Sequence, residues 1–232
     1  MKKISLFVSA FLLSTISFAQ TAEEVINNYV TAIGGKDAIS KIKDLTMTFT
    51  GEVQGANLEV VIQKKSPNKF IQAVNVTGMG EVQKQVCDGT KVRASGMQGS
   101  EDITDPEKVK AVAMQAVIVP ESEYAAMGAK LTYAGKEKVN ATDAHKIDVA
   151  IGSVKMTEYY DAATGLKIRQ VITAETPMGS QTITSDFTDY KEVNGVKFAH
   201  KLNQDMGMMQ LALSASKIEA NTNLADALFE IK

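Results

Sequence analysis

Few side chains in this 232-residue sequence are spaced for catalysis. His145 and His200 are its two histidines, and neither has a second histidine three or four positions away, as a zinc site on a helix requires. Both are expected at the surface or at a strand edge. Residues 96–100 read Gly-Met-Gln-Gly-Ser, which is not the Gly-x-Ser-x-Gly turn of serine hydrolases. We therefore expect no catalytic residue, no metal and no cofactor, and we predict that the protein is not an enzyme.

Acidic residues gather in two places. Glu101, Asp102 and Asp105 precede a predicted helix, where negative charge interacts favourably with the helix dipole, and Asp186 and Asp189 lie late in a predicted strand. Neither group has the spacing of a calcium-binding loop. A glycosidase-type pair of carboxylates stays open as an alternative, because its two members need only be close in space.

The sequence is rich in methionine and has a single cysteine. Eleven methionines are present, and residues 206–209 read Met-Gly-Met-Met at an expected hairpin tip. Flexible thioethers fill gaps in a core, line apolar ligand sites or bind Cu(I), so these three interpretations of the cluster stay open. Cys87 has no partner for an internal disulfide, and we expect it to be a small buried residue of a strand.

Composition and charge indicate a folded domain that does not bind nucleic acid. Hydrophobic residues make up 44% and charged residues 22% of the chain, which excludes wholesale disorder. Without Lys2 and Lys3 the chain has 23 basic and 27 acidic side chains, a net charge of −4, and no block of basic residues that could neutralise phosphates. After residue 20 no apolar stretch approaches the roughly 20 residues of a membrane span, so the protein is not expected to span a membrane.

The N-terminus has the pattern of a secretory signal peptide. Lys2 and Lys3 are followed by an apolar stretch over residues 4–16 and by the small-x-small sequence Ser-Phe-Ala at residues 17–19. We expect residues 1–19 to be removed by cleavage after Ala19, and the mature chain to be periplasmic. No linker or repeat divides residues 20–232, which predicts a single domain.

Three helical segments are expected. Residues 21–24 read Thr-Ala-Glu-Glu, a capping box that begins an amphipathic helix ending at the glycines of residues 34–35. A shorter helical segment follows over residues 36–43. An Asp-Pro pair at residues 105–106 begins an inserted helix, expected over residues 106–119.

The rest of the chain is predicted to form strands. Residues 45–50 alternate apolar and hydroxyl side chains, as a half-buried antiparallel strand does, and turn residues separate further segments of this kind. The predicted strands are residues 45–50, 57–64, 69–77, 81–87, 91–95, 130–139, 145–151, 154–161, 166–173, 181–190, 196–203 and 208–218.

About a dozen short strands with few helices predict a mainly β fold, an open antiparallel β-barrel with helices covering or plugging its concave side. Such a shape holds an apolar ligand in its mouth or lumen. The alternation in the first two strands and the apolar face of the inserted helix select the candidate lining, which is Leu45, Met47, Phe49, Leu58, Val60, Ile62, Val112 and Met114.

Residues 29–38, 159–166 and 189–198 resemble exported outer-membrane lipoprotein-sorting proteins of the LolA-like superfamily. They are also similar to accessory regions of M16-type zinc proteases, whose catalytic domain has no counterpart in this chain. The resemblance implies an unclosed half-barrel, a cavity that receives acyl chains, and no cofactor. The lid arginine of the sorting chaperones has no clear match, since Arg93 and Arg169 are the two arginines of this chain.

Two functions follow from these expectations. The first is a non-enzymatic carrier that binds lipid or lipoprotein acyl chains, or another apolar ligand, with the helix of residues 106–119 as a movable lid. The alternative is an accessory module of the cell envelope whose core is filled by its own side chains and whose partner is an envelope protein.

Overall fold

The structure is a computed structural model that describes residues 20–152, 154–176, 179–207 and 209–231. Thirteen antiparallel strands form one sheet in the order β6-β5-β4-β3-β2-β1-β13-β12-β11-β10-β9-β8-β7. The strands are β1 (Asp44–Val53), β2 (Ala56–Lys65), β3 (Lys69–Val76), β4 (Gly80–Cys87), β5 (Val92–Gly96), β6 (Gly99–Ile103), β7 (Lys130–Val139), β8 (Thr142–Ile151), β9 (Val154–Asp161), β10 (Lys167–Thr176), β11 (Gly179–Val193), β12 (Val196–Asp205) and β13 (Gln210–Ala220).

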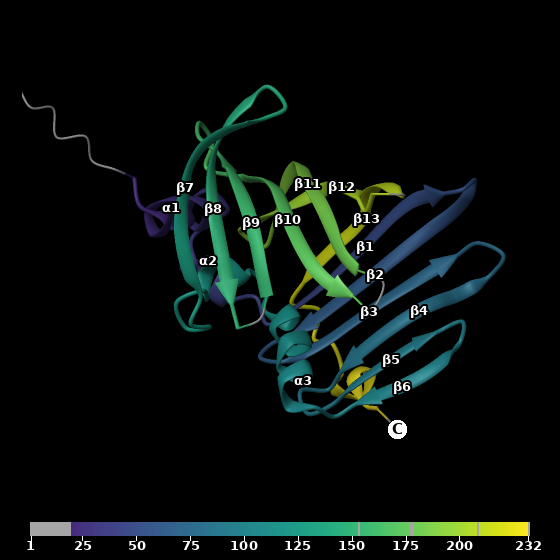
Figure 1. Cartoon of the computed structure of the whole chain (residues 1–232). Coiled ribbons are helices and arrows are strands. Elements are labelled where there is room, and N and C mark those ends of the chain that lie inside the picture. The colour runs from purple at the N-terminus through teal and green to yellow at the C-terminus, as the bar shows by residue number, and fades with distance from the viewer. Residues whose placement is uncertain (1–19, 153, 177–178, 208, 232) are drawn as a thin grey trace, which may run out of the picture.

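Two meanders, formed one after the other along the chain, make up the sheet. The chain starts with β1 in the middle of the sheet, reaches one edge at β6, crosses to the opposite edge at β7, and returns to pair β13 with β1. The sheet is strongly curved and stays open between β6 and β7 (Figure 1). The mainly β, open-barrel architecture expected from the sequence is therefore confirmed.

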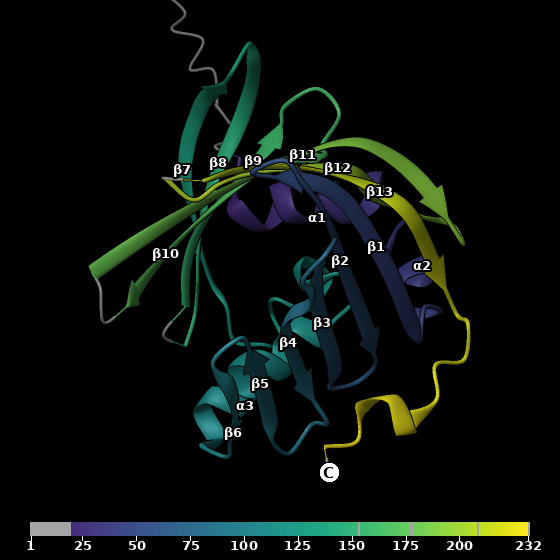
Figure 2. The same ribbon diagram turned by 90° about the vertical axis from the view of Figure 1, so that its right-hand side faces the viewer.

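The helices lie on the concave side of this sheet. α1 (Ala22–Ala32) begins at the predicted capping box, in which the Thr21 side chain accepts from the Glu24 amide, and α2 (Lys36–Ser40) follows. α3 (Pro106–Ala113) lies in the crossover between β6 and β7. Figure 2 shows α1 inside the arch of the sheet and α3 next to β5 and β6.

Two details differ from the sequence-based expectation. The strand β6 was not predicted, because its exposed acidic residues suggested a helix N-terminus; it pairs with β5, and Asp102 forms a bidentate ion pair with Arg93. The inserted helix was predicted to run to residue 119 but ends at Ala113, and a short 3₁₀ turn follows over Met114–Ala116. β-branched residues and the following Pro120 disfavour helix here, and Val117 is extended.

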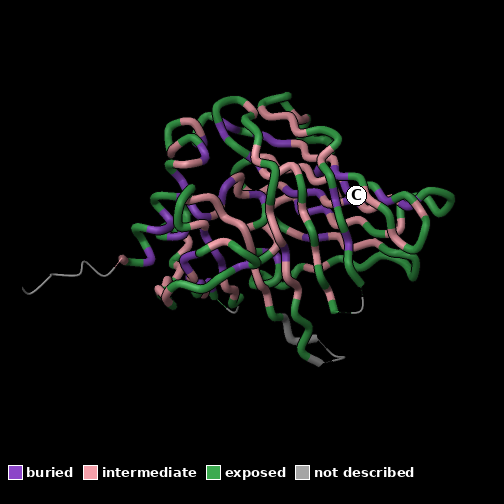
Figure 3. The backbone as a smooth tube through the Cα atoms, turned by 90° about the horizontal axis from the view of Figure 1, so that it is seen from above, coloured by how far each residue is buried: buried purple, intermediate pink, exposed green. Residues whose placement is uncertain are grey.

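The main core forms between α1 and one half of the sheet. Val25, Ile26 and Tyr29 of α1 pack with Ile147 of β8 and Tyr160 of β9 among other buried residues. Buried and exposed positions alternate at the start of β12 and of β13, and Figure 3 shows buried, intermediate and exposed positions interspersed along the strands. α1 thus fills the concave side beneath β7–β9, while the space in front of β1–β3 is left to be closed by the crossover.

The C-terminal segment covers part of the convex face. Phe229, in the 3₁₀ turn Asp226–Phe229, is fully buried against Ile71 and Val86. Asp44 anchors the start of this segment, because its carboxylate accepts from the backbone amides of Thr222 (2.8 Å) and Asn223 (3.1 Å). Among the described residues, no helix is long and apolar enough to cross a membrane.

Candidate functional site

Two adjoining cavities lie on the concave face, beneath the crossover segment, which we define as residues 104–129 between β6 and β7. The larger has a volume of about 480 Å³ and the smaller about 230 Å³. They share five lining residues, Met47, Ile62, Pro120, Glu121 and Lys167. The two cavities therefore form one site, which we call the concave site.

The walls of the concave site are mostly apolar. Side chains from β1, β2, β11 and β12 line its smaller cavity, and residues of the crossover segment and of β9 and β10 line the larger. The apolar members include Phe49, Phe187, Phe198 and Leu202 in the smaller cavity and Phe70, Met114, Met127, Met156 and Ile172 in the larger.

Four of the eight side chains proposed from the sequence line this site. Met47 and Ile62 line both cavities, Phe49 lines the smaller one, and Met114 lines the larger one. The period-2 pattern of β1 and β2 placed Met47, Phe49 and Ile62 on the inner face, and the structure brings them together across paired strands, with Met47 opposite Ile62.

The other four proposed side chains lie elsewhere. Leu45 is fully buried in the main core with α1. Val60 and Leu58 pack in a second apolar cluster further along the sheet, and Leu58 also lines a separate, polar groove. Val112 of α3 packs against a third cluster that contains Phe70. They share the inner face of the sheet or the apolar face of α3 but do not line the concave site.

A buried group of charges lies at the boundary of the two cavities, and the sequence analysis did not identify it. The Lys167 ammonium of β10 pairs with Glu121 of the crossover segment and with Glu158 of β9, at 3.2 Å from the Glu158 Oε1. The exposed fraction is 12% for the Lys167 side chain, 2% for Glu121 and 0% for Glu158. We call this group the Lys167 cluster.

Neutral donors complete the Lys167 cluster around Glu158. The Tyr160 hydroxyl donates to Glu158 Oε2 at 2.6 Å and the Tyr124 hydroxyl donates to the same oxygen at 3.0 Å. The Gln170 amide donates to Oε1 at 2.9 Å. Glu158 is thus satisfied by four partners, whereas the hydrogen bonding of Glu121 depends on Lys167.

The environment keeps the Lys167 cluster ionised. Burial alone would lower the pKa of Lys167, but Glu121 and Glu158 outweigh it and raise the pKa well above the ordinary value. Burial would likewise raise the pKa of Glu158, but the charge of Lys167 and the donated hydrogen bonds hold that pKa below its ordinary value. Lys167 and Glu158 therefore form a buried pair of opposite charges at neutral pH.

Lys64 is a second cation in the larger cavity. It lies near the end of β2, partly buried, and its ammonium donates to the Val117 carbonyl of the crossover segment at 3.0 Å. Burial lowers the pKa of Lys64 to about 8, with Glu121 opposing this effect and Lys167 adding to it. Lys64 and the Lys167 cluster hold the crossover segment to both walls of the half-barrel.

The pattern of β9 is the one feature of the sequence that indicates the Lys167 cluster. Met156, Glu158 and Tyr160 alternate on the inner face of β9, so a carboxylate occupies a position that the pattern assigns to the core. A buried carboxylate requires a cationic partner. The partner's identity was not predictable, because Lys167 follows a turn and Glu121 lies on the crossover segment.

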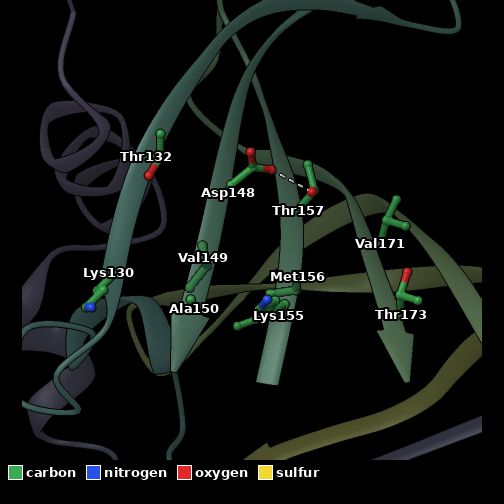
Figure 4. A pocket seen from close by; sticks show the side chains of 10 residues that line it. All are labelled: Lys130, Thr132, Asp148, Val149, Ala150, Lys155, Met156, Thr157, Val171 and Thr173. Carbon is green, nitrogen blue, oxygen red and sulfur yellow. Dashed lines mark hydrogen bonds between the residues drawn. The ribbon is translucent and has the colours of Figure 1, made fainter. Parts of the chain in front are cut away.

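A third cavity lies on the opposite face of β7–β10, and Figure 4 shows the side chains around it. Its volume is about 490 Å³, and its rim is rich in hydroxyl and charged groups. Asp148 accepts from the Thr157 hydroxyl at 2.7 Å across neighbouring strands. Met156 lines this cavity as well as the concave site, but the third cavity has no buried ion pair among its lining residues and lacks the phenylalanine side chains of the concave site, so we do not regard it as the candidate site.

The histidines and the methionine cluster do not contribute to the concave site. The expectation of a surface or strand-edge histidine is wrong for His145, which is buried in β8 between β7 and β9, with its Nδ1 3.1 Å from the Tyr133 hydroxyl. Within the described residues, no group of three His, Cys, Asp or Glu side chains is arranged to hold a metal ion. Met206 and Met209 lie at the turn between β12 and β13 and line neither cavity, and Met208 lies outside the described residues.

The fold and the concave site define a class of protein, the open antiparallel half-barrel with helices on its concave side. Solved structures of the same shape include LolA-like proteins. A LolA superfamily protein from Nitrosomonas europaea superposes with a TM-score of 0.60 at 10% identity, covering 92% of this chain and 99% of that one. The chain therefore has the LolA-like fold expected from the resemblance.

Two further structures support the same fold. A putative outer membrane lipoprotein-sorting protein domain from Vibrio parahaemolyticus gives a TM-score of 0.56 at 12% identity, covering 90% of this chain and 96% of that one. A DUF1329 family protein from Desulfovibrio piger gives 0.57 at 10% identity, covering 90% and 97%. No family model and no curated protein matches the sequence. These structures lend no support to the similarity with M16 protease accessory regions.

Proposed function

We propose that the protein is a non-enzymatic carrier that binds lipid or lipoprotein acyl chains in the concave site. The observation that carries this proposal is the pair of adjoining apolar cavities, about 480 and 230 Å³, beneath a crossover segment. Small-molecule pockets in proteins have volumes of roughly 300–1,000 Å³, and the larger cavity lies within this range. Flexible thioethers of Met47, Met114 and Met156 suit chains of variable shape.

We further propose that the carrier works outside the cytoplasm. The signal-peptide pattern, which lies outside the described residues, supports cleavage after Ala19 and a periplasmic chain that begins at Gln20. The LolA-like fold agrees with a role in the cell envelope. An intact mass that corresponds to residues 20–232 supports export, and retention of residues 1–19 contradicts it.

The crossover segment is proposed to act as the lid of the concave site. α3 docks mainly through Val109, Val112, Ala113 and the following Ala116, which are short side chains with limited apolar area. The polar bonds from Lys64 and from the Lys167 cluster add the attachment to the walls. Segments that bury little apolar surface open at a lower free energy than the strands of a sheet.

Amide exchange measures this lid directly. Addition of dodecanoate slows exchange over residues 106–119, because a chain beneath the segment gives its apolar face a partner. Residues 166–173, which lie largely in β10 between two strands, stay protected with and without the ligand. Equal protection of both regions without ligand, and no change on addition, identifies the segment as a fixed plug.

The fixed plug corresponds to the second candidate function, an accessory module of the envelope that binds a protein partner. The burial of the Lys167 cluster favours this candidate, because a structural ion pair between the crossover segment and the sheet resists opening. The exchange experiment therefore separates the two candidates by a single comparison between the lid and β10.

A further inference from the structure

Lys64 has unused hydrogen-bonding capacity inside the concave site. An ammonium group carries three donors, and among the described residues the Val117 carbonyl is the acceptor of one of them. No carboxylate of the described residues lies within 4.0 Å of the Lys64 ammonium, whereas the neighbouring Lys167 has two. The positive charge of Lys64 thus faces the larger cavity without a direct counter-ion.

Two amides lie beside this cation. Gln72 of β3 and Gln115 of the crossover segment line the same cavity as Lys64, and their side chains make no hydrogen bond to another described residue. Gln72 pairs with Ile62 and Phe70 pairs with Lys64, so Gln72 and Lys64 are diagonal neighbours on the inner face of two adjacent strands. Besides the Lys167 cluster, the larger cavity therefore offers one ammonium and two amides to a ligand.

A partly buried cation in an apolar cavity is stabilised by an anionic partner. We propose that Lys64 binds the negatively charged headgroup of an acyl-chain lipid, a carboxylate or a phosphate, while the chain occupies the apolar part of the concave site. This inference rests on the proposed carrier function. Gln72 and Gln115 supply amide donors to the remaining oxygens of the headgroup.

The charges around Lys64 are compatible with an anion at this position. Glu121 of the crossover segment and Lys167 of β10 face it, Tyr124 lines the same cavity, and the buried Glu158 of β9 is the second carboxylate paired with Lys167. Lys167 pairs with both carboxylates, which reduces their repulsion of an incoming headgroup. Burial raises the pKa of Tyr124, so it remains a neutral hydroxyl. The pKa of about 8 leaves Lys64 predominantly charged at neutral pH.

Paired ligands test the proposal on the intact protein. Dodecanoate and 1-dodecanol have the same chain but differ in charge, and displacement of a fluorescent apolar probe gives the affinity of each. At about pH 7 the ratio of dodecanoate to dodecanol affinity falls at least about 10-fold in Lys64→Met, which corresponds to the loss of one charge-assisted contact. Lys201→Met, an exposed lysine beside the inward Leu202, keeps the wild-type ratio.

Lys64→Arg provides a readout that a purely structural role does not affect. Binding of dodecanoate raises the pKa of Lys64, so the wild-type protein takes up protons on binding at about pH 8.5, and its affinity weakens as the pH rises further. An arginine stays charged, so Lys64→Arg binds dodecanoate without proton uptake and keeps its affinity at about pH 9.5. Calorimetry in buffers of different ionisation enthalpy measures the uptake.

The outcomes separate this inference from the carrier function. An unchanged affinity ratio in Lys64→Met, or no proton uptake by the wild-type protein, overturns the headgroup assignment. If both ligands nevertheless bind tightly, the carrier function still stands. Failure of both ligands to bind contradicts the carrier function itself. Competition by acetate as strong as that by dodecanoate overturns the lipid assignment and indicates a site for small anions.

Discussion

Lys167→Met lowers the free energy of unfolding by about 3–5 kcal/mol, because it leaves two buried carboxylates without their cation. Glu121 is the more affected of the two, since Glu158 keeps the hydroxyls of Tyr124 and Tyr160 and the amide of Gln170. For a chain of this size the loss corresponds to a fall in the melting temperature of roughly 6–20 °C. Thermal and urea unfolding measure both quantities.

A surface ion pair serves as the matched control. Lys146 lies 3.0 Å from Glu137 and is replaced by methionine in the same way, but the exposed fractions of 31% and 52% predict a loss below about 1 kcal/mol. The double variant Lys167→Met/Glu121→Gln regains at least about 1 kcal/mol over Lys167→Met, because one uncompensated charge is removed. Equal losses in Lys167→Met and Lys146→Met contradict the role assigned to the Lys167 cluster.

The stability contributed by the Lys167 cluster depends on pH in a defined direction. The folded-state pKa of Glu158 is depressed, so its contribution is present above the ordinary carboxyl pKa and is lost as the pH falls through the folded value. The folded-state pKa of Lys167 is raised, so its contribution is complete below the ordinary lysine pKa and is lost as the pH rises through the folded value. In Lys167→Met the Glu158 carboxyl loses the positive charge that holds its pKa down and protonates more readily, so the deficit relative to the wild-type protein narrows below neutral pH.

Phe49→Asp is expected to destabilise the fold and to abolish ligand binding together. Phe49 is 5% exposed, packs with Leu58 and Leu213, and lines the smaller cavity of the concave site. The substitution removes a large apolar side chain and places an unpaired charge among apolar groups, at a cost of about 3–5 kcal/mol. Thermal unfolding and retention of bound acyl species both measure the effect.

Thr50, the next residue on β1, is the control for Phe49 because it faces the outer side of the sheet. Thr50 is exposed, and successive side chains of a strand point to opposite faces. Thr50→Asp therefore changes stability by no more than about 0.5 kcal/mol and leaves bound lipid in place. If Phe49→Asp matches Thr50→Asp in melting temperature and lipid content, Phe49 does not line a functional cavity.

Local patterns in the sequence were sufficient to predict most of the fold. The capping box at Thr21 and Glu24 and the period-2 alternation of β1 specify local structure through contacts between neighbours in the sequence. Prediction failed where a tertiary contact decides the outcome. The strand β6, Gly-Ser-Glu-Asp-Ile, is exposed at its first four residues and gives no apolar alternation, and it exists because it pairs with β5.

The concave site was predictable only in part for the same reason. The strand period assigned Met47, Phe49 and Ile62 to the inner face, where the structure has them. It also assigned Leu58 and Val60 to that face but could not show how far along the sheet the cavities extend, since that depends on where the crossover segment lies. Glu121 and Lys167 are 46 residues apart, so nothing local in the sequence pairs them.

The central claim is that the concave site holds acyl chains rather than a filled core. Native mass spectrometry of protein purified from its own envelope fraction, followed by organic extraction and lipid analysis, tests it most directly. The carrier predicts a noncovalent mass increment that matches an extracted acyl species in the wild-type protein and that is lost in Phe49→Asp. Wild-type protein that carries no acyl species, and that gains none when incubated with dodecanoate, would contradict the account.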